Sequence, residues 1–96
     1  LPAGEFRWLT VISPEGPEDV ELLLEPNATP IAQRFQKDCY EAEIPAASFG
    51  VEDVRAEYER LTRLGVSFPQ SPARMGTATV AVLDDTCGNL IQLVQD

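Results

Sequence analysis

The strongest constraint on the fold is an amphipathic helix in the second half of the chain. Asp53 stands at its start, where a carboxylate caps free amide groups and suits the helix dipole. Val54, Tyr58 and Leu61 recur at helical spacing, so they share one face. Gly65 follows the last turn, where a left-handed residue commonly ends a helix. The helix therefore packs one apolar face against another element.

Strand patterns surround this helix. One strand is predicted before it, at residues 46–51, and a short strand is predicted after it at 66–68. A loop at 70–76 contains Pro72 and Gly76, which interrupt regular structure. Two apolar strands close the chain, at 77–83 and 90–95, around a polar turn at 84–89. The order from Ala46 is strand, helix, strand, strand, strand, which is a βαβββ unit.

The first half of the chain predicts a hairpin and a connector. Residues 6–13 and 20–25 are rich in aromatic, aliphatic and β-branched side chains, and a turn with two prolines and a glycine separates them. Pro30 favours the start of a short helix through Gln36. We expect this segment to connect two halves of one domain.

The two hairpins of the chain resemble each other. Val20–Glu21–Leu22 matches Ile91–Gln92–Leu93, about 70 residues further along, and each triplet lies in the second strand of its hairpin. The chain therefore reads as one complete βαβββ unit preceded by the second half of another.

Composition excludes several functions. The chain has 16 acidic and 7 basic residues, a net charge of -9, so its surface repels nucleic acids and anionic membranes. It has no His, and Cys39 and Cys87 are isolated, which argues against a zinc site of the Cys/His kind and against His-dependent catalytic triads. Two lone cysteines fit a reducing compartment, and we expect the protein in the cytoplasm.

The segment Val80–Gln95, with its Asp-Asp-Thr-Cys-Gly-Asn turn, resembles the closing motif of the vicinal-oxygen-chelate superfamily (glyoxalase, bleomycin-resistance and extradiol-dioxygenase proteins). Phe49–Val54 and the helix after it resemble the strand-to-helix segment of that superfamily, and Phe6–Val11 resembles the third strand of its first unit. The resemblance implies an α+β fold of paired βαβββ units around a cavity. It implies a single domain at 1–96, with a hairpin at 1–26, a connector at 27–45 and a complete unit at 46–96. The first strand, helix and strand of the first unit are expected to be absent from this chain.

The resemblance also implies a metal site, which members of the superfamily build from the first and last strands of each unit. Ala46 falls at one ligand position and cannot bind a metal. Gln92 falls at another, as a weak oxygen ligand. Glu21 falls at a third by the repeat, with Glu25, on the same face of the strand, as the alternative if the register slips. Glu21 is also the best candidate for a catalytic base.

Two further residues are candidates for ligand binding beside Glu21 and Gln92. Trp8 offers a flat surface for stacking a ligand, although we favour packing in a core or an interface as the explanation for it. Arg74 lies before Gly76, near the expected cavity mouth, where it would bind an anionic group or be solvated.

Three functions remain open at this point. We favour a metal-free protein that binds a small, preferably cationic ligand in its cavity. The alternative is a lyase or dioxygenase that uses a divalent metal (Ni, Zn, Mn or Fe) in an intact form, and the third is a remnant without activity. Because a half-unit leaves strand edges and an apolar sheet face uncovered, we expect two chains to complete each other as a homodimer.

Overall fold

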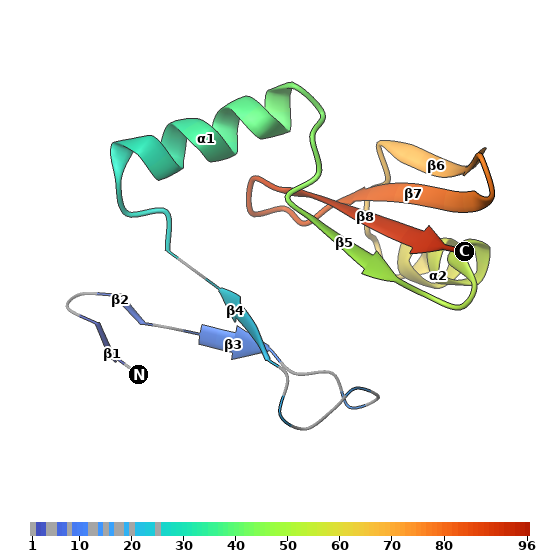
Figure 1. Ribbon diagram of the computed structural model, residues 1–96, viewed down its shortest axis with the longest axis horizontal. Helices are drawn as coiled ribbons and strands as arrows, with labels where there is room; N and C mark the ends of the chain where they lie inside the picture. The colour runs from blue at the N-terminus through green and yellow to red at the C-terminus, as the bar shows by residue number, and fades with distance from the viewer. Residues whose placement is uncertain are drawn as a thin grey trace.

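The computed structural model describes residues 2–3, 6–7, 9–11, 14, 16, 19, 21–24 and 26–96. Its second half contains four strands and one helix: β5 at Ala47–Gly50, α2 at Val54–Arg63, β6 at Gln70–Met75, β7 at Ala78–Asp84 and β8 at Leu90–Gln95. The strands form one curved sheet in the order β5-β8-β7-β6 (Figure 1). β5 and β8 are parallel, and the other neighbours are antiparallel. This arrangement confirms the predicted α+β class and the complete βαβββ unit.

The ends of α2 follow the sequence signals. The Asp53 side chain accepts a hydrogen bond from the Ala56 amide at 3.1 Å, which caps the first turn. Gly65 follows the C-terminal turn with φ +93°, a conformation that glycine adopts without steric cost. The predicted helix start and stop are therefore confirmed.

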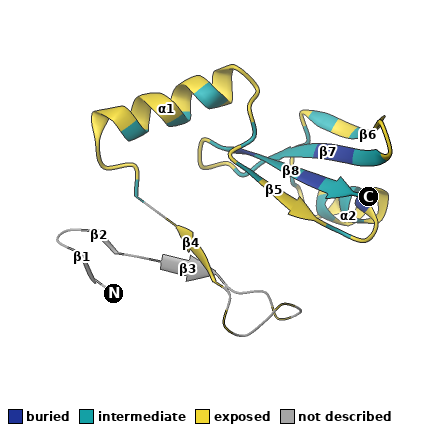
Figure 2. Cartoon of the chain, viewed as in Figure 1, coloured by how far each residue is buried: buried dark blue, intermediate teal, exposed yellow. Residues whose placement is uncertain are grey.

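The core lies between α2 and one face of the sheet (Figure 2). Val54 on α2, Ala81 on β7 and Leu93 on β8 form its buried centre, with exposed fractions of 0%, 0% and 7%. The Tyr58 and Phe68 rings meet edge to face, with their centroids 4.9 Å apart. Leu64, the residue that follows the last turn of α2, is 70% exposed and lies outside this core.

The segment after α2 differs from the sequence prediction. Residues 66–68 are not a strand, and the predicted loop at 70–76 contains β6, an edge strand paired with β7. The register between these strands shifts between Gln70 and Ala73, around Pro72. An edge strand with an irregularity tolerates a proline, because the missing N–H is not needed by a neighbour. Pro72 therefore lies within an edge strand, and Gly76 (φ +65°) follows the end of that strand. The two residues do not mark a loop.

The turn between β7 and β8 behaves as its composition predicted. Asp85 Oδ1 accepts hydrogen bonds from the backbone amides of Cys87 (2.7 Å) and Asn89 (3.0 Å), and Asp84 Oδ1 accepts one from the Thr86 amide (2.8 Å). Gly88 takes the expected positive φ of +95°, and Thr86 also has a positive φ, +66°. The acidic side chains thus satisfy the turn's backbone donors.

The described residues of the first half form two small antiparallel ladders. β1 (Pro2–Ala3) pairs with β2 (Phe6–Arg7), and β3 (Leu9–Val11) pairs with β4 (Leu22–Leu24). The β3–β4 pair confirms the predicted hairpin, although its described strands are shorter than predicted. It is hydrogen-bonded as a sheet of its own, separate from the four-stranded sheet. Trp8, Val20 and Glu25 lie outside the described residues.

A helix, α1 (Pro30–Glu41), connects the two halves of the chain. The Thr29 hydroxyl accepts a hydrogen bond from the Ala32 amide at 3.1 Å, and Pro30 occupies the first turn, as the sequence predicted. The helix runs five residues beyond the predicted end at Gln36. A Lys37–Glu41 pair at 4.0 Å supports the added turn, and none of the residues of α1 is buried.

Candidate functional site

Strand pairing defines a face of the sheet that α2 does not cover. In the register of the sheet, Ser48 is opposite Gln92, Gln92 is opposite Val82, and Val82 is opposite Gln70, so these four side chains lie in one row across all strands. The core residues Ala81 and Leu93 alternate with this row and point to the other face, toward α2. We call the surface of the row and its neighbours the open face: Ser48, Gly50, Gln70, Ala73, Val82, Gln92 and Val94.

The open face is apolar with neutral hydrogen-bonding groups. Val82 and Val94 are half-buried, and so are the amides of Gln70 and Gln92. Ser48 and Gly50 are exposed, and a Cβ added at Gly50 would meet no atom within 4 Å. Binding sites for small molecules usually combine apolar walls with a few polar groups, and the open face has this composition.

Gln92 therefore lies where a ligand on the open face would touch it, in the middle row of the sheet. Ala46, the other ligand position on this unit, is on the same side by alternation, and its amide donates to the Leu90 carbonyl at 2.8 Å. A methyl group there offers no metal ligand. Within residues 26–96 and the shorter described segments, His, Cys, Asp and Glu form no group of three or more that could hold a metal ion.

Glu21 is not brought beside Gln92. It is exposed and lies directly before β4, whose pairing partner is β3. The repeat between the two hairpins is therefore visible as two similar strand pairs, but these pairs belong to separate sheets in one chain. Trp8 and Glu25, the other candidates from this half, are among the residues that the structure does not describe.

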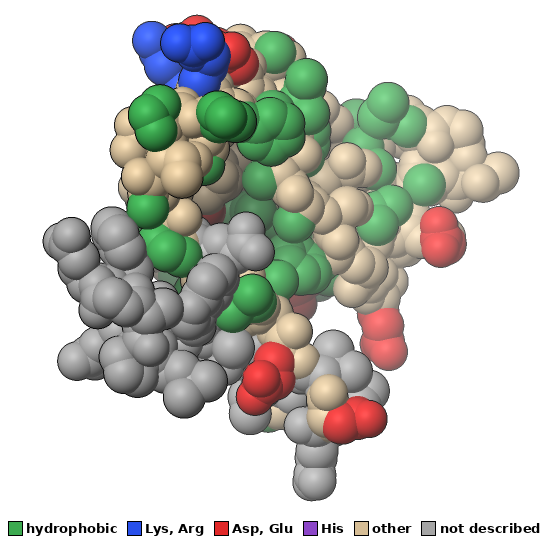
Figure 3. Space-filling model, turned by 60° about the vertical axis from the view of Figure 1, so that its left-hand side comes forward, with side chains coloured by type: hydrophobic (Ala, Val, Ile, Leu, Met, Phe, Trp, Pro, Cys, Tyr) green, Lys and Arg blue, Asp and Glu red, His purple; other side chains and the backbone are tan. Residues whose placement is uncertain are grey.

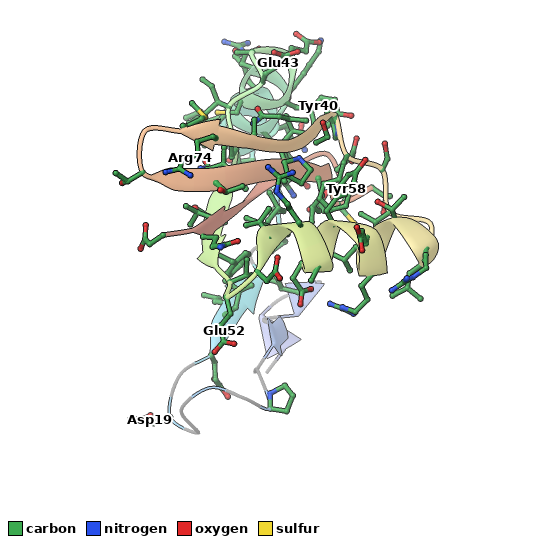
Figure 4. All side chains as sticks on the ribbon, turned by 90° about the vertical axis from the view of Figure 1, so that its right-hand side faces the viewer. Asp19, Tyr40, Glu43, Glu52, Tyr58 and Arg74 are labelled. Carbon is green, nitrogen blue, oxygen red and sulfur yellow. The ribbon has the colours of Figure 1, made fainter. Side chains whose placement is uncertain are left out.

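Arg74 lies on the other side of the sheet from Gln92. It is opposite Thr79 on β7, and Thr79 is opposite Gln95 on β8, which alternation places on the face toward α2. Gln95 confirms this placement, because its side-chain oxygen accepts a hydrogen bond from the Val54 amide at 2.8 Å. The Arg74 Nε donates a hydrogen bond to the Gly76 carbonyl at 3.3 Å, near the end of β6 (Figure 4). Arg74 and Gln92 thus do not face the same ligand in one chain.

Side chains from α1 fix the end of the open face where β7 stops and β8 begins. The Gln36 amide group donates to the Cys87 carbonyl and to the Asn89 side-chain oxygen, both at 3.0 Å. One turn further, the Tyr40 hydroxyl donates to a carboxylate oxygen of Asp84. This hydrogen bond, with that of the Thr86 amide, lowers the pKa of Asp84, and the hydrogen bond to the carboxylate raises the pKa of Tyr40.

Sequence reasoning missed this contact between α1 and the turn. Asp84 was recognised as a turn residue, but the partners of Gln36 and Tyr40 lie 44 to 53 residues away. The only local signal was that polar residues at 36 and 40 stand four apart on one helix face. Between the helix and the sheet, the contact leaves a hollow of 320 Å³. Its walls include Phe35, Ile44, Ala46 and Leu90.

The chain is similar to a known protein family and to a known protein over nearly its whole length. The sequence model described as the Glyoxalase/Bleomycin resistance protein/Dioxygenase superfamily matches residues 2–93. The uncharacterized protein YurT of Bacillus subtilis (strain 168) is 52% identical over 95 residues, which cover 99% of this chain and 75% of that protein.

Two solved structures are similar in fold. The crystal structure of UcmS2 has a TM-score of 0.71 and 35% sequence identity, over 98% of this chain and 74% of UcmS2. A member of the glyoxalase/bleomycin resistance protein/dioxygenase superfamily from Sphaerobacter thermophilus DSM 20745 has a TM-score of 0.65 and 23% identity, over 95% of this chain and 68% of that one.

Proposed function

Because the chain belongs to the glyoxalase/bleomycin-resistance/dioxygenase superfamily, we propose that it binds a small organic ligand on the open face of its four-stranded sheet. The observation that carries the proposal is the row formed by Ser48, Gln92, Val82 and Gln70, which puts two amides and a hydroxyl among apolar side chains. A flat or aliphatic ligand packs on the valines, and its polar groups bond to the amides.

The charge of the molecule narrows the class of ligand. Asp84, two residues after Val82 on β7, puts one carboxylate at the end of the open face, and the chain has a net charge of -9. A negative field raises the local concentration of cations. We therefore propose an apolar ligand that carries hydrogen-bonding groups and a positive charge.

A second copy of the chain closes the cavity in this proposal. The hairpin at 1–26, the connector at 27–45 and the unit at 46–96 then act as one domain within a homodimer. The exposed leucines of β4 support this, since Leu22, Leu23 and Leu24 are each 43–45% exposed in the single chain and would be covered by a partner. The cytoplasm suits two cysteines that are both free thiols, Cys39 and Cys87. In the part of the chain that is described, the helices are too short or too polar to cross a bilayer.

The second candidate function is a lyase or dioxygenase that depends on a divalent metal. The observation in its favour is the position of Gln92 on the open face, where its side-chain oxygen would act as one ligand. Glu21 from a second copy would supply another, and Trp8 and Arg74 of a partner would contact the substrate. Ala46 counts against this function, because it removes a ligand from the same face.

Dye binding tests the proposed site. Thioflavin T, a flat cationic dye, should bind to the purified protein more tightly than the anionic dye 1-anilinonaphthalene-8-sulfonate. Ser48→Trp fills the exposed end of the row and should abolish binding, and Gln92→Ala should weaken it several-fold, since one hydrogen bond contributes about 1 kcal/mol. Thr62→Ala, at an exposed neutral position on α2, is the matched control. Equal binding by all of the variants would disprove the assignment.

Metal addition separates the two candidate functions. The protein is titrated with Ni²⁺, Zn²⁺, Mn²⁺ and Fe²⁺ while its thermal unfolding is followed, and the purified sample is analysed for bound metal. A binding protein without a metal site shows no selective rise in Tm. A stoichiometric metal that raises Tm, with loss of the effect in Gln92→Ala, would favour the enzyme.

A further inference from the structure

The outer side of α1 carries an apolar stripe that has no partner among the residues that the structure describes. Ile31 and Phe35 are one turn apart and are 83% and 70% exposed. With Ala42 and Ile44 they line an open groove of 510 Å³ along the helix. Gln36 and Tyr40 point the other way, toward the turn between β7 and β8, and hold the helix in this orientation.

The charges beside this stripe are unlike those of the rest of the chain. α1 has two basic and two acidic residues and is neutral, whereas the whole chain has a net charge of -9. Lys37 and Glu41 pair with each other on another side of the helix. Arg34 and Asp38 line the groove, and neither takes part in an ion pair among the described residues. Figure 3 shows basic, acidic and hydrophobic side chains together in the upper part of the molecule, where α1 lies.

We propose that this face of α1 is the contact with a second copy of the chain, with two α1 helices packed antiparallel across a twofold axis. Arg34 and Asp38 are one turn apart, so an antiparallel neighbour places Arg34 of one copy opposite Asp38 of the other, and symmetry forms the pair twice. Phe35 of both copies packs between these pairs, and Ile31 lies one turn beyond them on the same apolar stripe. The stripe supplies affinity, and the charges fix the direction and register of the helices.

Charge identifies a second copy as the occupant. Two chains of charge -9 repel each other over most of their surfaces, and a neutral helix face is where that repulsion is least. The arrangement of one positive and one negative charge is also complementary to itself, which a contact between identical faces requires. A basic partner protein, by contrast, would be drawn to the acidic surfaces elsewhere. The inference rests on the homodimer proposed above and assigns α1 as a contact between the two copies, in addition to the exposed leucines of β4.

Light scattering on the eluting protein measures the mass at several concentrations. The original sequence should have twice the chain mass of 10.5 kDa, and Phe35→Glu should have the mass of one chain, with self-association at least tenfold weaker. Lys37→Glu, on the other side of α1, changes the charge by more and should stay dimeric. Because Phe35 is exposed, circular dichroism of the variant should be unchanged.

A charge exchange tests the antiparallel register. Arg34→Asp and Asp38→Arg should each weaken self-association several-fold in low salt, and the double exchange should restore it. A Phe35→Glu variant that stays dimeric would overturn the inference, and so would a double exchange that self-associates as weakly as the single exchanges. Either result would leave the homodimer itself in place. A monomer for the original sequence would overturn both, while dye binding on the open face would still report on the proposed ligand site.

Discussion

Removal of the Asp85 carboxylate tests whether the turn between β7 and β8 holds this edge of the fold together. The carboxylate accepts three hydrogen bonds: from the Cys87 amide at 2.7 Å, the Asn89 amide at 3.0 Å and the Asn89 side-chain amide at 2.8 Å. Asn89 in turn accepts a hydrogen bond from Gln36 of α1. Asp85→Ala therefore loosens both the turn and the helix attached to it.

The stability lost by Asp85→Ala depends on which of these three donors would be left buried without an acceptor. A hydrogen bond to a charged acceptor contributes about 1.5 kcal/mol or more, but the amide of exposed Cys87 can bond to water instead. The two bonds from half-buried Asn89 count in full, so we expect Asp85→Ala to lower the free energy of unfolding by about 3 kcal/mol. For a domain of this size that corresponds to a fall in Tm of about 12–24 °C.

Urea unfolding followed by circular dichroism, at one fixed protein concentration, measures the change. Asp96→Ala is the matched control, since it removes the same charge from an exposed residue. A difference between Asp85→Ala and Asp96→Ala below about 1 kcal/mol would refute the reasoning, because the three hydrogen bonds would then be replaced by water at little cost.

Three other changes have defined outcomes. Val54→Ala should lower the free energy of unfolding by about 2–3 kcal/mol in urea, since Val54 is fully buried, whereas Leu64→Ala at an exposed position should cost little. Gly65→Ala should cost about 1 kcal/mol through its φ of +93° alone, because a Cβ there meets no atom within 4 Å; an unchanged Tm would contradict this. For Tyr40→Phe the prediction concerns pH. The pKa of Asp84 is lowered in the folded chain, so the contact contributes stability above the ordinary pKa of 3.8, and this stability is lost as pH falls through the folded pKa. The pKa of Tyr40 is raised, so the contact also contributes stability below the ordinary pKa of 10.0, and this stability is lost as pH rises through the folded pKa. The stability lost by Tyr40→Phe should therefore be constant near neutral pH and shrink toward both extremes, and a loss that does not vary with pH would argue against the contact with Asp84.

The sequence by itself determined the ends of α2 and the turn between β7 and β8. The ends of α2 depend on Asp53 and Gly65, and the turn after β7 depends on Asp85 and Gly88, all of which act within a few residues of themselves. Alternation in β8 also determined that Gln92 and Leu93 point to opposite faces. Such features need only the period of a strand or a helix and the conformational preference of one residue.

Only the tertiary structure decided how these elements combine. The side of the sheet on which Arg74 lies depends on a register shift around Pro72 and on pairing with β7, and a one-residue slip would reverse it. The contacts of Gln36 and Tyr40 with the turn join residues far apart in the chain, so no local pattern announces them. Long-range pairing is chosen by the packing energy of the whole fold, and a sequence pattern records only which side chains are available for it.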